Sequence, residues 1–253
     1  MNEACIRWTV DGPIARISLN RPKVLNALNE DSYHGLVAAF DAIERQDQAA
    51  LAVIDSGGCR AFSAGADLKF MRSLSGATLR RFIELSWWIG QRISSCRLLT
   101  VARLNGYTLG GGAELALACD LRIAAPDTII GFPEMTYGSV PGSGAAQRLQ
   151  KLIGPARALE MIVNGRRVQA HEAASIGLVN FVFSDEVAVG EWMALLSSRP
   201  AEAIGYLKAA MRMGGDPMAA SAFHGLVSAT RQADPDYRAR TQTFALSHPS
   251  AQA

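Results

Sequence analysis

The sequence has few cysteines and histidines and almost no net charge, and each of these features argues against a class of protein. Four cysteines in 253 residues show no Cys-x-x-Cys spacing, so we expect free thiols in a reducing compartment. Four histidines without metal-ligand spacing predict neither a metal site nor a serine–histidine–aspartate triad. The N-terminus has no apolar run long enough for a signal peptide or membrane span, which predicts a cytoplasmic protein without a membrane partner. A net charge of +2 gives no field that recruits nucleic acid.

The residues that are present predict one folded α/β unit. Hydrophobic residues make up 49% of the chain and charged residues 19%, which is the composition of a globular protein. Segments 5–10 and 14–19 are typical of a β-hairpin, and Asn29 is expected to cap a helix over 32–45. Further strands are expected at 51–55, 98–104 and 121–125, and further helices at 78–95 and 113–119. Strands that alternate with helices predict a mostly parallel, buried sheet.

The last third of the chain is expected to be mainly helical. From about residue 143 onward one helical segment follows another, and only 178–183 resembles a strand. We therefore expect a core over 1–195 and a helical C-terminal region over 196–253 that joins subunits and covers the active site.

Three segments hold glycine where the backbone rather than the side chain is important. They are CRAFSAGADLKFM at 59–71, NGYTLGGGAELALACD at 105–120 and GFPEMTYGSVPGSGAAQRL at 131–149. In the first two, small residues precede an expected helix, whose first amides have no intrahelical partner and can donate to an anion or a polarised carbonyl. Asp67 fits both a helix cap and a ligand contact. The triple glycine matches neither a phosphate-binding loop nor the dinucleotide fingerprint.

Two glutamates lie in these segments and suit proton transfer. Glu114 follows the triple glycine, and Glu134 lies between a proline and a Gly-Pro-Gly turn. One carboxylate of such a pair can hold a proton while its ionised neighbour accepts one from water. Together with two sets of free amides, the pair predicts a site for a substrate whose carbonyl oxygen gathers negative charge, which is an enolate site.

These segments resemble the enoyl-CoA hydratase/isomerase (crotonase) superfamily, as do NRPKVLNAL at 20–28 and NGRRVQAHEAASIGLVNFV at 164–182. The resemblance extends over most of the chain. It implies an α/β fold, a crotonase-like spiral of ββα units with a helical C-terminal region. It also implies homotrimers that pair into hexamers, and an acyl-CoA thioester as the substrate with no cofactor.

The resemblance further implies roles for particular residues. The backbone amides of Ala66 and Gly111 would form the oxyanion hole. Glu134 would donate a proton to the α carbon, and Glu114 would activate water. The CoA moiety would lie along six residues, although solvated surface charge is the alternative for the two lysines: Lys23, Val24, Ala64, Asp67, Leu68 and Lys69.

One position near the C-terminus departs from the family pattern, and one group of residues is a candidate for the pocket that holds the acyl chain. Ser247 stands where members commonly carry a lysine that approaches the CoA of a neighbouring subunit. Trp87 and Trp88, with Pro141 and Gly142, are similar to an aromatic-lined acyl pocket, while core packing is the alternative for the two tryptophans.

Reversible hydration of the 2,3 double bond of an enoyl-CoA thioester is the expected function, because both glutamates are present. A Δ3,Δ2-enoyl-CoA isomerase or another acyl-CoA lyase of the superfamily is the alternative, since it needs the oxyanion hole and one base. A non-catalytic RNA-binding or scaffold role is a further alternative, which the near-neutral charge disfavours.

Overall fold

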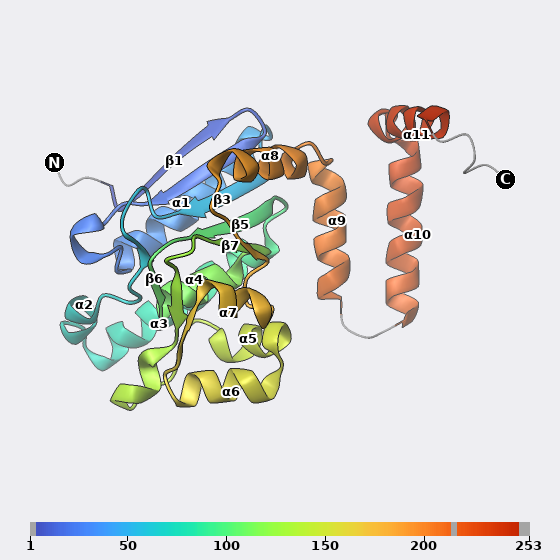
Figure 1. Cartoon of the computed structure of the whole chain (residues 1–253). Coiled ribbons are helices and arrows are strands. Elements are labelled where there is room, and N and C mark those ends of the chain that lie inside the picture. Colours follow the sequence, from blue (N-terminus) through green and yellow to red (C-terminus); the bar gives the residue numbers. More distant parts are fainter. Residues whose placement is uncertain (1–3, 214–216, 248–253) are drawn as a thin grey trace. The chain divides into compact units, whose positions relative to one another are not determined.

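Two β-sheets form the centre of the N-terminal unit in the computed structural model, which describes residues 4–213 and 217–247, with side chains up to residue 243 (Figure 1). The chain divides into two compact units, residues 1–201 and residues 202–253. Among the described residues, no helix has the length and apolar character needed to cross a membrane.

The larger sheet has six strands, and all but one of its neighbouring pairs are parallel. β1 and β2 form the expected hairpin, in which Ile6 pairs with Leu19 and Asp11 pairs with Ile14. In spatial order the strands are β1 (Ile6–Asp11), β2 (Ile14–Leu19), β3 (Leu51–Asp55), β5 (Leu99–Leu104), β7 (Leu121–Ala124) and β10 (Phe181–Val182).

The smaller sheet has four short strands, and only its last pair is antiparallel. Its strands are β4 (Ala61–Ser63), β6 (Tyr107–Leu109), β8 (Ile129–Gly131) and β9 (Arg167–Gln169). The sequence patterns did not predict β6, β8 or β9. A strand of three residues is too short to show the alternation of apolar and polar side chains that identifies strands.

From β3 to β8, consecutive strands of the chain alternate between the larger and the smaller sheet. β3 is followed by β4, β5 by β6 and β7 by β8, and each pair leads into one or more helices. Every such turn of the chain adds one strand to each sheet, so the fold is a spiral of ββα units, and the expected fold class is confirmed. The helices of this unit are η1 (Pro22–Val24), α1 (Glu30–Gln46), α2 (Leu68–Arg72), α3 (Gly76–Ser95), α4 (Gly111–Ala118), η2 (Pro133–Tyr137), α5 (Ala145–Ile153), α6 (Pro155–Val163), α7 (Ala170–Ser175) and α8 (Glu186–Ser197).

The larger sheet is buried on both faces. Ala52 and Ile54 of β3 belong to the main core, which extends to α1, α3 and α4, whereas Leu51 and Val53 belong to a second cluster with residues of α8. Successive side chains of a strand point to opposite faces. A strand with both faces covered therefore reads as a continuous apolar run, as LAVID does.

Local signals set the helix ends near the site. Asn29 caps α1 as expected, since its side chain accepts a hydrogen bond from the Ser32 amide at 3.0 Å. Asp67 caps α2 in the same way and accepts from the Phe70 amide at 3.1 Å. These caps fix the first turns of α1 and α2, and both helices supply residues to the cavity described below.

The second unit consists of α9 (Ala201–Arg212), α10 (Pro217–Ala233) and α11 (Pro235–Ser247). Arg231 on α10 donates to Glu202 at 2.7 Å and to Asp234 at 2.6 Å, which ties α9 to α10. Exposed apolar side chains remain on both helices, among them Met211 and Met218, each 80% exposed.

Candidate functional site

A cavity of about 160 Å³ lies where three parallel strands of the smaller sheet end. Its wall includes residues 64–66 after β4, residues 110–111 after β6 and residues 133–134 after β8. The carboxyl ends of parallel strands are common ligand sites, because the loops that follow them converge there. The apolar part of the wall comes from Leu68, Met71, Phe82, Ile83 and Val140.

Two free backbone amides meet at this cavity. The amides of Ala66 and Gly111 donate to no acceptor within the described part of the chain. A β-carbon built on Gly111 would lie 3.4 Å from the Ala66 nitrogen, so the two segments are in contact. Gly65 makes this approach possible, since its φ is +101° and a β-carbon there would lie 2.8 Å from the Leu109 oxygen. The arrangement can hold a developing oxyanion.

Glu114 projects from the first turn of α4 and is 3% exposed. Its Oε1 accepts hydrogen bonds from the amides of Ser143 at 2.7 Å and Ala145 at 3.0 Å. Burial raises the pKa of Glu114 above its ordinary value, whereas these amides and the positive charge of Arg148 oppose the rise. Specific donors thus offset part of the cost of burying the charged form of Glu114.

Glu134 lies in η2, is 8% exposed and has the opposite environment. Its Oε2 is buried without a hydrogen-bond partner among the described residues. Burial raises the pKa of Glu134 to about 7, and the negative charge of Glu114 adds to the rise. Gly110 leaves room for this carboxylate, since a β-carbon there would lie 2.7 Å from Glu134 Oε1. Near neutral pH Glu134 can therefore hold a proton, and any negative charge on Glu114 favours that protonated form.

Five residues with a hydroxyl group also line the cavity, and the sequence patterns predicted none of them. We call three of the five, Tyr33, Ser86 and Ser143, the hydroxyl cluster. The oxygens of Ser86 and Ser143 are 2.6 Å apart, and Tyr33 is 2% exposed. Burial raises the pKa of Tyr33, so its hydroxyl stays neutral, and hydrogen bonds with both serines oppose the rise. These residues come from α1, α3 and the turn before α5, and no local motif connects them.

Two of the six residues expected along CoA line the cavity. Ala64 and Leu68 belong to its wall. The Ala64 amide donates to the Leu25 oxygen at 2.9 Å, which places the η1 segment beside residues 64–67. Lys23, Val24 and Lys69 are exposed.

Asp67 has a structural role within this group. It caps α2 and accepts from Arg21 at 3.0 Å. Burial tends to raise the pKa of Asp67, but the hydrogen bonds from Phe70 and Arg21 outweigh it and lower the pKa. These contacts account for Asp67 without a ligand.

Only one of the four residues expected at the acyl pocket lines the cavity. Gly142 belongs to the cavity wall, whereas Trp87, Trp88 and Pro141 do not. Trp88 is 66% exposed, which excludes core packing for it. Trp87 lies under the guanidinium of Arg148, 5.6 Å from the ring centroid, and so supports the cation beside Glu114. The side chain of Ser247 lies outside the described residues.

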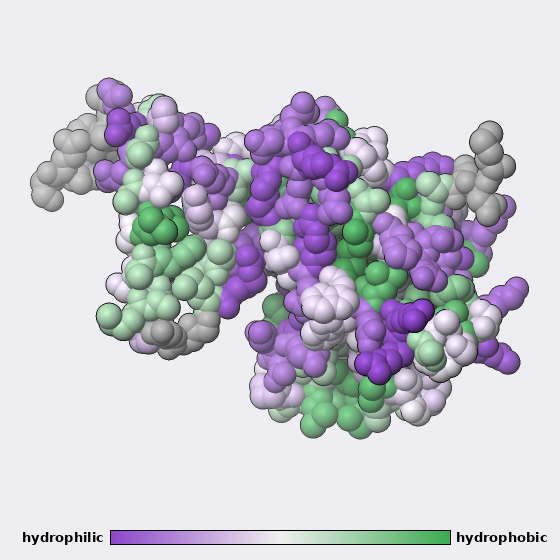
Figure 2. All heavy atoms as spheres, turned by 180° about the vertical axis from the view of Figure 1, so that it is seen from behind, coloured by the Kyte–Doolittle hydropathy of each residue, from purple (hydrophilic) through white to green (hydrophobic). Residues whose placement is uncertain are grey.

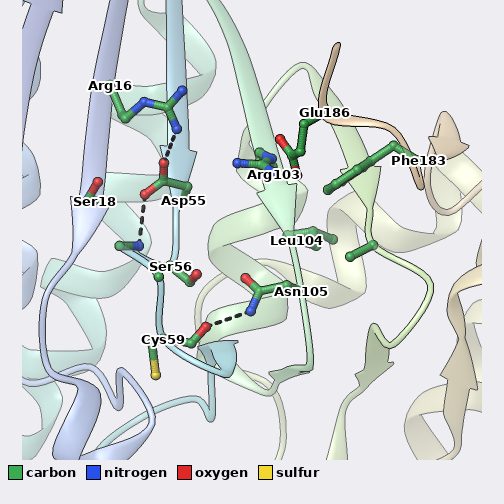
Figure 3. Close-up of a pocket in the computed structure, with 13 residues that line it drawn as sticks. Arg16, Ser18, Asp55, Ser56, Cys59, Arg103, Leu104, Asn105, Phe183 and Glu186 are labelled. Atoms are coloured by element: carbon green, nitrogen blue, oxygen red, sulfur yellow. Dashed lines mark hydrogen bonds and ion pairs between the residues drawn. The ribbon is translucent and has the colours of Figure 1, made fainter. Parts of the chain in front are cut away.

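A second cavity, of about 540 Å³, lies at the carboxyl ends of β2, β3 and β5 in the larger sheet (Figure 3). Arg16 donates to Asp55 at 2.5 Å, and Arg103 pairs with Glu186 and stacks on Phe183, with 4.9 Å to the ring centroid. Each of these charges has a partner, so this cavity offers no carboxylate poised for proton transfer. Among the described residues, no group of three potential ligands could hold a metal ion.

The chain is similar to a known family over most of its length. A family described as enoyl-CoA hydratase/isomerase matches residues 9–227. A crotonyl-CoA hydratase of Syntrophomonas wolfei is 39% identical over 178 residues, which cover 70% of this chain and 68% of that protein. A short-chain-enoyl-CoA hydratase of Clostridium acetobutylicum is 36% identical over 172 residues, which cover 68% of this chain and 66% of that protein. The matched segment thus spans about two thirds of each relative.

Solved structures show the same fold over nearly the whole chain. The enoyl-CoA hydratase from Thermoplasma volcanium superposes with a TM-score of 0.89 at 30% identity and covers 95% of this chain and 97% of its own. A putative enoyl-CoA hydratase from Thermobifida fusca, solved in complex with acetoacetyl-CoA, has a TM-score of 0.83 at 27% identity and covers 91% of this chain and 95% of its own.

Proposed function

Because this chain belongs to the enoyl-CoA hydratase/isomerase family, we propose that it is an enzyme that adds water reversibly across the 2,3 double bond of an enoyl-CoA thioester. The observation that carries the proposal is the pair of glutamates at one cavity with opposite surroundings. Glu114 has two amide donors and a nearby cation, whereas Glu134 Oε2 has no partner among the described residues. This difference in surroundings suits Glu114 to act as the base and Glu134 to act as the acid.

In the proposed reaction, ionised Glu114 accepts a proton from water while the water oxygen forms a bond to C3 of the substrate. The electrons of the C2–C3 double bond move toward the thioester, whose oxygen becomes an enolate oxygen. The amides of Ala66 and Gly111 donate to that oxygen, and each such donor is typically worth about 2.7–4 kcal/mol. Protonated Glu134 then gives its proton to C2, and the two carboxyl groups exchange protons with solvent before the next turnover.

We further propose a short acyl chain as the substrate group. The cavity of about 160 Å³ is small beside the roughly 300–1,000 Å³ typical of pockets for drug-sized ligands. The names of the two relatives, crotonyl-CoA hydratase and short-chain-enoyl-CoA hydratase, agree with this size. The thioester itself is the substrate, so the proposed reaction needs no cofactor. Its CoA moiety is proposed to lie along the η1 segment and residues 64–69.

Assembly into trimers or hexamers is part of the proposal. Leu159 and Val163 on α6 are 65% and 51% exposed, and Leu226 on α10 is 69% exposed. Figure 2 shows hydrophobic side chains gathered over the lower surface of the core unit and, separately, over the C-terminal helices. Uncovered apolar faces of this kind are typical of protein interfaces. The free cysteines agree with a cytoplasmic location.

The test is turnover of crotonyl-CoA and longer enoyl-CoAs, followed by loss of the enoyl thioester absorbance. We expect Glu114→Gln to lower kcat by about 10²–10⁴-fold, the range of general acid–base catalysis. Glu191→Gln on the exposed side of α8 is the matched control and should leave kcat unchanged. Wild-type protein that hydrates none of these thioesters would refute hydration. Retained isomerisation of a 3-enoyl-CoA by Glu114→Gln would favour the isomerase instead, and tight RNA binding without turnover would favour a scaffold.

A further inference from the structure

Ser143 is held at three of its atoms by three different elements. Its amide donates to Glu114 on α4 at 2.7 Å, and its carbonyl oxygen accepts from Arg148 on α5 at 2.7 Å. Its hydroxyl lies 2.6 Å from that of Ser86 on α3. The turn is also packed closely on α3, because a β-carbon on Gly142 would lie 3.0 Å from Ile83 Cγ2. Ser143 and Glu114 line the same cavity, and hydrogen bonding from the Ser143 hydroxyl opposes the rise in the pKa of that carboxyl.

The hydroxyl cluster has fewer hydrogens than acceptors. Each hydroxyl supplies one hydrogen and can accept others, and its hydrogen rotates to suit the surroundings. Ser86 can donate to the Ile83 oxygen at 2.7 Å or to Ser143 at 2.6 Å. Ser143 can donate to Ser86 or to Glu114. Tyr33, which is neutral, can donate to either serine.

Two arrangements follow from this count. In the first, Ser86 donates to Ile83 and Ser143 donates to Ser86, so none of the three hydrogens points to Glu114. In the second, Ser143 donates to Glu114, and Ser86 turns from Ile83 to Ser143. The Ile83 oxygen lies within α3 and keeps its place in the helix, so this turn leaves no backbone group without a partner. An ionised carboxylate favours the second arrangement, because hydrogen bonds to charged groups are stronger.

We propose that Ser143 is a positioning residue for Glu114, and that the hydroxyl cluster turns one hydrogen toward this carboxylate when it is ionised and away when it has taken a proton from water. The proposal rests on the proposed hydration reaction, in which Glu114 alternates between these two states. It adds Ser143, Ser86 and Tyr33 to the residues that control the reaction, although none of them transfers a proton to the substrate.

Other charged and titratable groups also act on Glu114 and need to be separated from the cluster. Arg148 on α5 stabilises the negative charge of Glu114. Glu134 and Tyr137, both in η2, interact with the same charge, and Tyr33 on α1 does so as well. Ser143→Ala leaves all four groups in place and keeps the Ser143 amide. It therefore removes the hydroxyl alone.

The experiment compares the pH dependence of kcat/KM for crotonyl-CoA in wild-type protein and Ser143→Ala. We expect the acid limb to move upward by about one pH unit, as for loss of one hydrogen bond to a charged group, with a roughly tenfold loss of kcat/KM on that limb and little change on the plateau. Ser94→Ala is the matched control on α3, where the hydroxyl bonds to the Gly90 and Ala118 oxygens away from the cavity. It should keep the wild-type profile.

Ser86→Ala tests the hydrogen bonds within the hydroxyl cluster, and it replaces Ser143→Ala in the experiment if that variant does not fold. It removes the donor behind Ser143, so we expect a smaller upward shift of the acid limb. The double variant should behave like Ser143→Ala alone, because the two changes break one chain of hydrogen bonds. A wild-type acid limb in Ser143→Ala, or in Ser86→Ala when only that variant folds, would overturn the proposal. So would independent, additive shifts in the double variant. Wild-type protein without hydratase activity would refute the proposed function instead.

Discussion

Gly110 links the start of α4 to the carboxylate of Glu134, and its replacement by alanine gives a sharp prediction. Gly110 has a φ of +48° and a ψ of −125°, which residues with a β-carbon rarely adopt. A β-carbon there would lie 2.7 Å from Glu134 Oε1, well inside an ordinary contact distance of at least 3.4 Å. Gly110→Ala therefore strains the backbone and displaces the proposed proton donor.

The two effects have different sizes and different readouts. Backbone strain of this kind costs about 1–3 kcal/mol of folding stability. Relief of the overlap requires a shift of about 0.7 Å in the carboxylate oxygen, the difference between 3.4 and 2.7 Å. Misplacement by about 1 Å can cost a catalytic group about 10²-fold in rate. We therefore expect kcat to fall by about 10–100-fold, or about 1.4–2.7 kcal/mol in activation free energy.

Gly12→Ala separates strain from displacement. Gly12 lies in the β1–β2 turn with a φ of +54°, and a β-carbon there would meet nothing within 4 Å. We expect Gly12→Ala to lower the unfolding free energy by about 1 kcal/mol without changing kcat. The assays are urea unfolding and initial rates of crotonyl-CoA hydration on folded protein. If kcat of Gly110→Ala stays within twofold of wild type, the Glu134 carboxylate does not act from this position, and the acid assignment is wrong.

The remaining predictions concern charge. Wild-type kcat/KM should fall as pH rises above about 7, because Glu134 then loses the proton that we propose it donates to C2. An alkaline limb unchanged in Glu134→Gln would contradict this. The folded pKa of about 7 exceeds the ordinary 4.5, so Glu134 contributes stability that is fully present below 4.5 and lost as pH rises through 7. Glu134→Gln should therefore gain up to about 3 kcal/mol relative to wild type between about pH 4 and pH 8, measured by urea unfolding, and a constant difference would refute burial as the cause. Asp67→Ala should lose about 1–2 kcal/mol at neutral pH. Because the folded pKa of Asp67 is lowered, that loss should shrink as acid protonates wild-type Asp67, and equal losses at all pH values would exclude its charge as the cause.

The sequence predicted those parts of the fold that local signals determine. The Asn29 cap and the hairpin of β1 and β2 lie where composition and periodicity indicated them. β9 escaped prediction because it owes its existence to a distant partner, β8, with which Val168 pairs at Ile130. Three residues bury too little surface to form a strand alone, so tertiary pairing and not local propensity determines such an element.

The same distinction separates the predicted site residues from the missed ones. Glu114 and Glu134 stand out because glycine and proline surround them in the chain. Ser86 and Ser143 lie 57 positions apart, and each is an ordinary residue of a helix or a turn. Trp87 was expected at the acyl pocket, with core packing as the alternative, but it is not part of the cavity wall, and no pattern could show that its ring lies against Arg148.

The difference between the two glutamates arises from backbone geometry and not from residue type. The turn that ends at α5 directs two amides at Glu114, so a negative charge there has donors even though water is excluded. Glu134 is buried beside that charge and has one oxygen without a partner among the described residues, so its neutral form is favoured. In the proposed reaction, a water that loses its proton to Glu114 therefore has a proton donor close by for C2. The proposed order of proton transfers follows from which carboxyl receives the amides, so we expect a change that removes them from Glu114 to affect both steps at once.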